Sequence, residues 1–586
     1  MSRGRTWAFR LILVALPFVV LGLLELGLRL GGFGHDVEPL FVASPQHPEY
    51  LQANPRAVAR FFNRPEEAPA VSIETAYFRA HKAPGTFRVF VQGESSAAGF
   101  PYGLGASLAG VLDQRFKRAF PDREVEVIST AMAAVNSYAL LDFADEIIAQ
   151  QPDAVVIYVG HNEYLGILGV GSSLRMASRP WLTRAFLAAR DWRLFQLMAR
   201  VLARTGAAHE EPLTTASDTL MARVAGERSI PLRSEMFSRG VEQFEANLGA
   251  LLEKYRNAGV PVFIGTLVSN ERDQTPLAVL SGSESDSAGA AKTAYFAAQD
   301  AEGLGDFHAA RSGYGWARDL DPLRFRAPSV FNEAVAQLAK AYGATLVDVH
   351  QAFVDASPHG LVGNGLILEH VHPNLDGYSL LADAFFKTMV GHGLPGPPQV
   401  AVPAPQAMLE MPVSDIDRWL GEYKVTRVKS AWPFTPNSVQ PALPPPRSEG
   451  ERLAQEVYAQ RMTWPQAQDA LRQYYRSVGN LAEYTRGTAI LADAFPFTPG
   501  IQFECAAALI EAGRPADALR YARRSVDLEP SDVNHLLVTA HALLLTGRRA
   551  EGRAALEQVL RVDPANATAR KVLAELQAGP TAEVTP

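Results

Sequence analysis

Cysteine is nearly absent from this 586-residue chain, which contains only Cys505. A single cysteine excludes an intrachain disulfide framework and any zinc site built on several thiolates. The chain also lacks an excess of basic residues: 55 lysines and arginines stand against 62 acidic residues, and the formal net charge is -7. Nucleic acid is therefore not an expected partner. The sequence contains neither an H-E-x-x-H motif nor a glycine loop of the phosphate-binding type, so it predicts no metal and no cofactor.

Long uncharged runs are also scarce, and the one that stands out lies near the amino terminus. Residues 11–24 carry no charge, and the continuation to Leu30 adds only Glu25 and Arg29. Twenty helical residues span about 30 Å, the thickness of the hydrocarbon core of a bilayer. We therefore expect residues 1–34 to form a membrane anchor. A cleaved signal peptide is the alternative, although no A-x-A cleavage site follows the run.

Basic residues near this run predict its orientation. Arg3, Arg5 and Arg10 precede it, and no arginine follows for a stretch after Arg29. Because positive charge favours the cytoplasmic side, the amino terminus is expected in the cytoplasm. In a bacterium the rest of the chain would then lie on the periplasmic side of the inner membrane.

Strand-like and helix-like segments alternate through the middle of the chain. The segment 35–85 is polar and rich in proline, and we interpret it as a stalk that wraps onto the domain. From residue 86 to residue 395, five segments rich in valine, isoleucine and phenylalanine predict strands: 87–92, 125–129, 153–159, 261–268 and 344–348. Helix-length segments separate them, which predicts an α/β domain with a parallel sheet and helices on both faces.

A candidate nucleophile follows the first of these strands. The apolar run ends at Gly93, and Ser95 comes two residues later, before small residues that let a helix begin close to the backbone. A serine at the carboxyl end of a parallel strand can be a nucleophile if a base and amide donors reach it. The third strand also ends in a glycine, soon followed by Asn162. Much later, Glu369 stands three residues before His372.

Together these blocks resemble the SGNH/GDSL hydrolase superfamily. Its G-[DE]-S block matches residues 93–95, its G-x-N-[DE] block matches residues 160–163, and its D-x-x-H block matches residues 369–372. A weaker block, N-x-G-x-x-G, falls on residues 129–134 with alanine at both glycine positions. The resemblance covers roughly residues 85–390 and implies a three-layer α/β/α sandwich around a parallel five-stranded sheet.

The resemblance also implies roles for individual residues. Carried over by position, Ser95 is the nucleophile, His372 is the base and Glu369 orients the base. The side chain of Asn162 and the backbone amides of Ser95 and Ala134 form the oxyanion hole.

Several features near these residues remain open at this stage. Glu369 is one methylene longer than the usual aspartate, so it must fold back or shift the chain to reach the imidazole. By its position, Ser96 should face into the following helix. His161 and His370 border the site, and structural roles are the simplest interpretation for both. Contact between His161 and substrate is a further hypothesis.

Two insertions, near residues 165–231 and 285–328, interrupt the hydrolase-like domain. The first holds seven arginines between residues 175 and 204, interleaved with tryptophan, phenylalanine and leucine. A helix of this kind would lie on an anionic membrane surface or cap the active site. An ordinary packed helix with a solvated arginine face is an equally good interpretation. The second insertion contains Gly305 and Pro322, 17 residues apart.

A repeat follows the proline-rich segment 396–447, which we interpret as a linker. Gly479, Gly513 and Gly547 are 34 residues apart, and so are Pro496, Pro530 and Pro564. This period resembles tetratricopeptide repeats, which implies an all-helical domain over residues 448–586 and a protein partner. The glycine-to-proline spacing of the second insertion is the same, so it looks like one more repeat.

These observations predict a serine esterase acting on an extracytoplasmic ester, for example an O-acyl group of a glycan or lipid. The expected mechanism proceeds through an acyl-enzyme with a Ser-His-Glu triad. An O-acyltransferase would use the same triad, because the two activities differ only in what resolves the acyl-enzyme. A non-catalytic assembly scaffold working through the repeats is the alternative of a different class.

Overall fold

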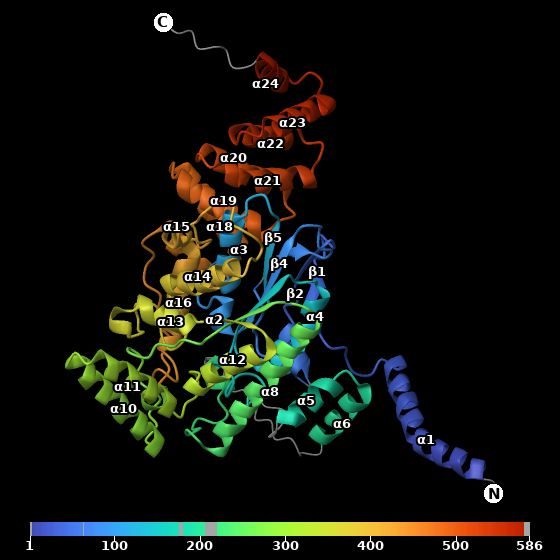
Figure 1. The fold of residues 1–586 in the computed structure, drawn as a ribbon, viewed down its shortest axis with the longest axis vertical. Coiled ribbons are helices and arrows are strands. Elements are labelled where there is room, and N and C mark those ends of the chain that lie inside the picture. The colour runs from blue at the N-terminus through green and yellow to red at the C-terminus, as the bar shows by residue number, and fades with distance from the viewer. Residues whose placement is uncertain (1–2, 63, 75, 175–179, 205–219, 579–586) are drawn as a thin grey trace.

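The computed structural model describes residues 3–62, 64–74, 76–174, 180–204 and 220–578. Figure 1 shows a central α/β body with a helical array at one end, while helix α1 (Arg3–Leu30) projects from its other side. Within the described part of the chain, α1 is the one helix long and apolar enough to cross a membrane. Its apolar stretch Ile12–Leu30 has a mean hydropathy of 2.1.

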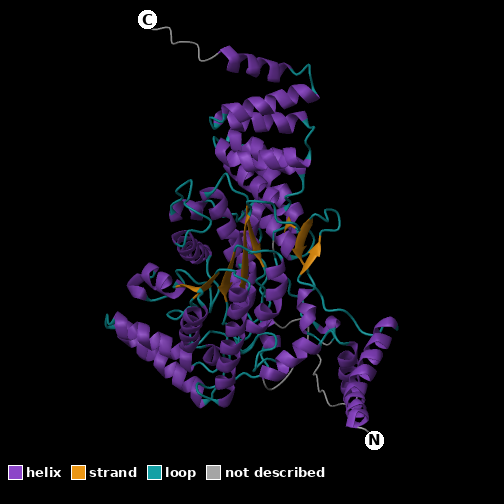
Figure 2. Ribbon diagram, turned by 45° about the vertical axis from the view of Figure 1, so that its right-hand side comes forward, coloured by secondary structure: helices purple, strands orange, loops and turns teal. Residues whose placement is uncertain are grey.

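The central sheet, seen among the orange strands in the middle of Figure 2, has five parallel strands. Their order is β5-β4-β6-β7-β8. Their bounds are β4 (Phe87–Gly93), β5 (Val125–Ser129), β6 (Ala154–Tyr158), β7 (Val262–Gly265) and β8 (Thr345–Val347). The five expected strands are confirmed, with ends that differ by a few residues. Every residue of β4 and β6 is buried, because these strands are central and both faces of the sheet are covered.

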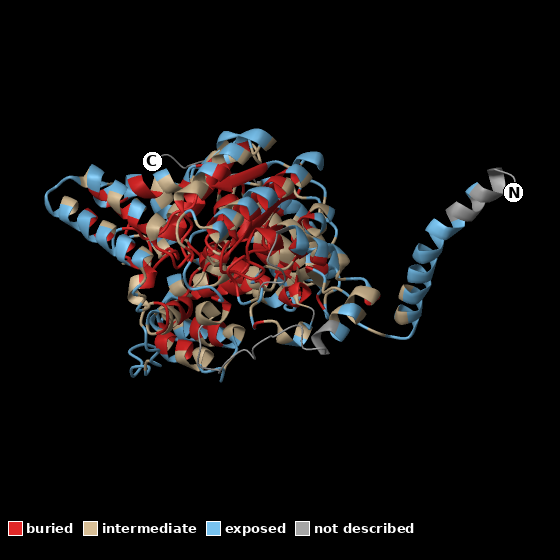
Figure 3. Cartoon of the chain, turned by 90° about the horizontal axis from the view of Figure 1, so that it is seen from below, coloured by how far each residue is buried: buried red, intermediate tan, exposed pale blue. Residues whose placement is uncertain are grey.

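Helices cover the two faces and make the three-layer sandwich. One layer contains α3 (Leu108–Ala119), α13 (Val349–Ala356) and α14 (Leu375–Gly391). The other contains α4 (Ser137–Ala149), α8 (Glu235–Asn257) and α12 (Ser329–Tyr342). Figure 3 shows the buried residues gathered in the middle of this body.

The segment interpreted as a stalk is part of this body. It forms a small antiparallel sheet of β1 (Phe41–Ala43), β2 (Tyr50–Ala53) and β3 (Phe78–Arg79), with 3-10 turns at Ala57–Phe61 and Pro65–Glu67. Leu40, Phe61 and Phe78 are buried in the main hydrophobic core. The segment therefore wraps onto the domain through its apolar residues, as expected, while its small sheet was not predicted from its proline-rich sequence.

Both insertions are helical. The first contains α5 (Pro180–Ala189), α6 (Arg193–Arg204) and α7 (Leu220–Val224), while residues 175–179 and 205–219 lie outside the described residues. The second contains a hairpin of α10 (Asp286–Gly303) and α11 (Phe307–Leu320), and the short helix α9 (Leu277–Leu280) precedes it. Gly305 closes this hairpin with a φ of 79°, a left-handed conformation that favours glycine.

The helical array begins inside the segment interpreted as a linker. That segment contains α15 (Ala404–Leu409) and α16 (Asp415–Lys429), followed by α17 (Glu449–Tyr458) and α18 (Trp464–Ser477). Ile416 and Leu420 of α16 share one buried cluster with Leu453 and Leu471 of the next two helices. The array therefore starts near residue 415 and not at residue 448.

The remaining helices follow the 34-residue period. They are α19 (Leu481–Ala494), α20 (Pro499–Glu511), α21 (Pro515–Leu528), α22 (Val533–Leu545), α23 (Arg549–Val562) and α24 (Ala567–Ala578). Gly479, Gly513 and Gly547 have φ values of 73°, 73° and 77° at the turns between paired helices, where a left-handed residue is needed.

Candidate active site

Ser95 is the first residue of the short helix α2 (Ser95–Ala98), which begins two residues after β4 ends. The turn is tight at Gly93: a Cβ atom there would collide with the carbonyl oxygen of Tyr158 and the Cβ of Ala97. Only glycine lets the strand end so close to its neighbour and still turn into the helix. The serine hydroxyl therefore lies at the carboxyl edge of the sheet.

His372 lies beside this serine. Its Nε2 is 2.8 Å from Ser95 Oγ, and its Nδ1 contacts Oε1 of Glu369. The tautomer that donates from Nδ1 to the carboxylate leaves Nε2 free to accept the serine proton. The ring of Phe100 packs against the imidazole, with the centroids 4.5 Å apart. The structure thus places the three residues of the expected triad in a single hydrogen-bonded chain.

Glu369 shows how the longer side chain fits. Its carboxylate folds back over the loop that follows it, and Oε2 accepts the backbone N–H groups of His370 and Val371 while also contacting His370 Nδ1. Burial alone would raise the pKa of Glu369, but His370 and His372 hold that pKa well below its usual range. One ionised carboxylate therefore serves two histidines.

Ser96 is buried, and its hydroxyl donates to the carbonyl oxygen of Val371 at 3.1 Å. This bond ties α2 to the loop that carries His372. Ser96 thus joins the two halves of the site, and its hydroxyl is already committed to a backbone partner.

Glu94 connects the nucleophile to the strand end that carries Asn162. Its two carboxylate oxygens accept the backbone N–H groups of His161 at 2.8 Å and of Asn162 at 3.0 Å. Burial raises the pKa of Glu94 to about 8, although the N–H donors favour the ionised form. Sequence reasoning treated Glu94 only as a motif position, whereas the structure shows that it fixes the two blocks relative to each other.

A second turn joins the expected oxyanion residues. Ala134 has a φ of 60°, the left-handed region in which a glycine would be favoured. Its carbonyl oxygen accepts the N–H of Ile167 at 2.7 Å. A Cβ on Gly166 would lie 2.6 Å from the backbone carbonyl oxygen of Asn162 and 2.8 Å from the backbone carbonyl oxygen of Ala134. Gly166 was missed by sequence reasoning, although a glycine four residues after the asparagine was visible.

Glu163 supports the site from behind. It is buried and accepts the hydroxyl of Ser137 at 2.8 Å and the N–H of the same residue at 3.1 Å, at the start of α4. Gln243 of α8 donates to it as well. Burial raises the pKa of Glu163 to about 7. This carboxylate therefore holds α4 and α8 against the end of β6.

His161 is buried close to the two other histidines. Its Nδ1 accepts the N–H of Ala327 at 3.3 Å, while Nε2 has no hydrogen-bond partner among the described residues. Burial, together with the charges of His370 and His372, lowers the pKa of His161 to about 3. The ring is therefore neutral with its proton on Nε2. Substrate contact by this N–H stays a prediction.

The segment after α16 covers His370. The ring of Phe434 packs against His370 with the centroids 5.5 Å apart, and Trp432 packs against Phe325 at 6.0 Å. These two aromatic residues come from the stretch interpreted as a linker, so no motif pointed to them. Together with Phe325, which also packs against His370, they form an aromatic cluster beside this histidine.

Glu369, His370 and His372 are also of the residue types that bind metals. Their ligand atoms lie within 4.8 Å of one another. Both imidazole Nδ1 atoms already face the carboxylate, and Nε2 of His372 faces Ser95. This arrangement suits proton transfer at Ser95, and we derive no step through a metal.

Comparisons with known proteins point to the same region. The model of the GDSL-like lipase/acylhydrolase family matches residues 91–380, and a tetratricopeptide repeat model matches residues 509–576. Among solved structures, a protein from Parabacteroides merdae described as a GDSL-like lipase is 13% identical, with 52% of this chain and 95% of that chain covered and a TM-score of 0.28.

Two further solved structures are similar to parts of the chain. An acetylxylan esterase from Geobacillus stearothermophilus is 15% identical, with 52% of this chain and 94% of that chain covered and a TM-score of 0.27. The first tetratricopeptide domain of the human RPAP3 protein is 20% identical, with 20% of this chain and 90% of that chain covered and a TM-score of 0.18. A comparison with curated proteins finds no match.

Proposed function

We propose, from the premise that this chain carries a GDSL-like lipase/acylhydrolase domain followed by tetratricopeptide repeats, that it is a membrane-anchored serine esterase. The observation that carries the proposal is the chain of contacts from Ser95 Oγ through His372 to Glu369. An isolated serine at a strand end has no base. Here the base is within 2.8 Å and is itself oriented by an ionised carboxylate.

The mechanism follows from this geometry. Ser95 attacks the acyl carbonyl while His372 Nε2 takes its proton, and Glu369 stabilises the imidazolium that forms. The oxyanion is received by the backbone amides of Ser95 and Ala134 and the side chain of Asn162. His372 then returns the proton to the leaving alcohol, and water resolves the acyl-enzyme by the same route.

The proposed substrate is an O-acyl ester of a glycan or lipid outside the cytoplasm. The apolar helix α1 supports an anchored protein, and the arginines ahead of it favour an extracytoplasmic domain. The Nε2–H of His161 is the proposed contact to a polar group of the substrate, because a buried donor without a partner gains from one.

Labelling with a fluorophosphonate tests the nucleophile. Wild-type protein should form a stable adduct, and Ser95→Ala should form none, because the attacking oxygen is gone. Ser96→Ala is the matched control, since its hydroxyl is bonded to a backbone carbonyl, and it should still label. If Ser95→Ala labels and Ser96→Ala does not, the assignment is wrong. Acetyl release from a chromogenic ester and from an acetylated polysaccharide then defines the substrate class.

A further inference from the structure

The arginine-rich helices α5 and α6 dock onto the domain through their arginines. Arg184 donates twice to Asn247 of α8, at 3.0 and 2.9 Å. Arg190 pairs with Asp142 of α4 at 2.6 Å, and Arg193 pairs with Asp36. Both earlier interpretations that left these arginines facing outward, toward solvent or an anionic surface, are therefore wrong for these three. The arginines are turned inward because acidic and amide partners lie there.

The outward side of the same helices is mostly apolar, although Arg200 of α6 is exposed as well. Trp181 is 62% exposed, Trp192 58%, Met198 61% and Val201 51%. Trp181, Ala185 and Ala188 follow a helical spacing of four and seven residues in α5, and Trp192 lies in the turn just before α6; all four are exposed. A surface helix of a soluble domain normally has the opposite arrangement, with its polar side outward. An exposed apolar face of this kind marks a surface that contacts something apolar.

The membrane-anchor helix α1 contacts helix α6 directly. The carboxylate of Glu25 in α1 accepts the first N–H groups of α6, from Arg193 at 3.0 Å and Leu194 at 2.9 Å. Arg29, one turn further along α1, pairs with Asp191 at 2.9 Å. These contacts cap the amino terminus of α6 with a charge from the anchor. Figure 1 shows α5 and α6 on the side of the body from which α1 leaves.

The position of Glu25 along α1 sets the depth of α6 relative to the bilayer. Helix α1 continues for five residues beyond Glu25, to Leu30, which is about 7.5 Å at 1.5 Å per residue. The start of α6 therefore lies beside the last turns of the apolar helix. Leu26 and Leu30 of those turns are 52% and 81% exposed, and Trp192 directly precedes the capped residue Arg193. Tryptophan is enriched at this level, where bilayer and water meet.

We propose that the outward face of α5 and α6 lies in the interface of a lipid bilayer, at the boundary between headgroups and acyl chains. The inference rests on the membrane anchor of the proposed function. Because Arg184, Arg190 and Arg193 already have partners within the protein, the contact depends mainly on apolar burial rather than on acidic lipids. With a second attachment beside α1, the hydrolase domain is held at a fixed orientation to the membrane surface.

Depth-dependent fluorescence quenching on the full-length chain tests this proposal. In a Cys505→Ala background, single cysteines are introduced by Trp181→Cys, Trp192→Cys and, as the matched control on α11, Trp316→Cys, which replaces a side chain that is 48% exposed. Each is labelled with an environment-sensitive fluorophore and reconstituted into phosphatidylcholine vesicles with or without spin-labelled lipid. Positions 181 and 192 should be quenched several-fold more than position 316, and equally so when acidic lipid is added.

A fourth label, from Leu16→Cys in α1, separates the inference from the anchor. If position 16 is quenched while 181 and 192 resemble 316, the anchor stands and the interfacial face is refuted. If position 16 is not quenched, the anchor itself fails. A blue shift at 181 and 192 without lipid quenching would mean that protein covers this face, which also overturns the proposal. Fluorophosphonate labelling of Ser95 confirms that each variant is folded.

Discussion

The carboxylate of Glu369 is divided between two imidazoles, and this division explains why a glutamate can stand where an aspartate is usual. The extra methylene lets the side chain turn back, so that one oxygen faces His372 and the other faces His370 and two backbone N–H groups. An aspartate in the same backbone would reach fewer of these partners. The loop conformation therefore depends on the length of this side chain.

Substitution of Glu369 should lower turnover strongly. Glu369→Gln keeps the shape but removes the charge and presents an amide to one histidine, so we expect kcat to fall by about 10³ to 10⁴. Glu369→Asp keeps the charge and should lose less. His370→Gln, which leaves the His372 contact in place, is the control and should cost at most about tenfold. If Glu369→Gln hydrolysed a chromogenic ester with the wild-type kcat, Glu369 would have no part in the mechanism.

Two buried carboxyl groups make stability depend on pH. The pKa of Glu94 is raised to about 8 and that of Glu163 to about 7, so the folded chain keeps protons that the unfolded chain releases. Their contribution to stability is therefore lost as pH rises. Ordinary histidines, with a pKa of about 6.5, are half protonated in the unfolded chain at about pH 6.5 and largely neutral only above about pH 7, where these two carboxyl groups set the slope of the free energy of unfolding with pH.

The free energy of unfolding should accordingly fall between about pH 7 and 8, by at most about 1.4 kcal/mol per pH unit for each group. Urea denaturation at several pH values measures the slope. Glu163→Gln removes one of the two groups and should make the slope shallower. A free energy of unfolding that rises across this range would show that both carboxyls are ionised in the folded protein.

Individual residues were predictable where their chemistry belongs to a motif. Ser95, Glu369 and His372 were found from motif blocks, and the structure brings them together. Gly166 and Trp432 were not found, because their importance lies in close approach to residues far away or in another segment. A sequence shows that a glycine is present but not which atoms its missing Cβ would touch.

At the scale of elements, the turn around Gly166 holds the two expected oxyanion residues in register. The oxygens of Asn162 and Ala134 both approach within 3 Å of the position of a Cβ on Gly166. Gly166→Ala should therefore push these segments apart and reduce kcat about tenfold to a hundredfold, with KM nearly unchanged. Gly259→Ala is unsuitable as a control because its φ is positive, whereas Gly289→Ala meets open space within α10. Equal kcat for Gly166→Ala and Gly289→Ala would contradict the proposed role of this turn.

The strands were predictable because each combines β-branched residues with a turn signal, and burial on both faces leaves long apolar runs. Helix α16 was not. Its sequence is polar, prolines flank it on both sides, and only contacts with α17 and α18 reveal its buried side. The proline-rich composition correctly predicted a linker at the two ends of this segment, but it gave no sign of the helix in the middle.

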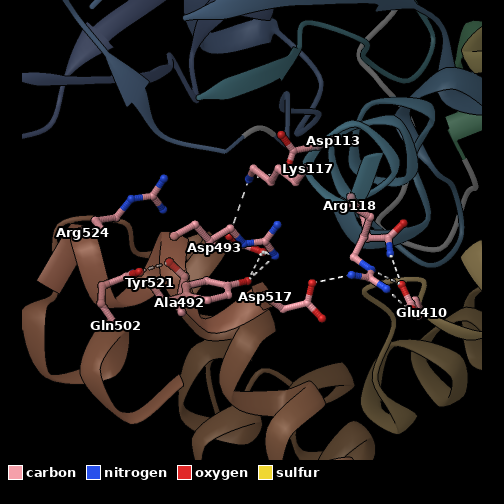
Figure 4. A network of polar contacts seen from close by, with 12 residues as sticks. Asp113, Lys117, Arg118, Glu410, Ala492, Asp493, Gln502, Asp517, Tyr521 and Arg524 are labelled. Carbon is pink, nitrogen blue, oxygen red and sulfur yellow. Dashed lines mark hydrogen bonds and ion pairs between the residues drawn. The ribbon is translucent and has the colours of Figure 1, made fainter. Parts of the chain in front are cut away.

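The whole molecule is joined by a charged interface between the hydrolase domain and the repeats (Figure 4). Lys117 of α3 is partly buried, with its Nζ 2.5 Å from Asp113 and 3.6 Å from Asp493 of α19. Despite burial, which lowers it, the pKa of Lys117 is raised by these two carboxylates. Arg118 pairs with Glu410 at 2.8 Å and with Asp517 of α21.

Further contacts extend this interface. Arg524 pairs with Glu124 at 3.1 Å, and the ring of Phe497 stacks on His47 at 4.2 Å. Arg548 pairs with Asp122. The sequence suggested repeats that follow a proline-rich linker and gave no sign of this interface, because charged partners hundreds of residues apart leave no local signal. The structure shows the array fixed against α3, which packs on α14 directly after the His372 loop.

Truncation distinguishes a docked array from a tethered one. Removing residues 448–586 takes away Leu453 and Leu471 and exposes Ile416 and Leu420, so this protein should aggregate or lose well over 10 °C in Tm. Removing residues 499–586 keeps that cluster and Asp493, and should lower Tm by only several degrees. Because the triad is complete in both, the longer protein should hydrolyse a small soluble ester at nearly the wild-type rate. Equal Tm values for the two truncations and the full chain would mean that the array contributes nothing to the domain and is only tethered to it.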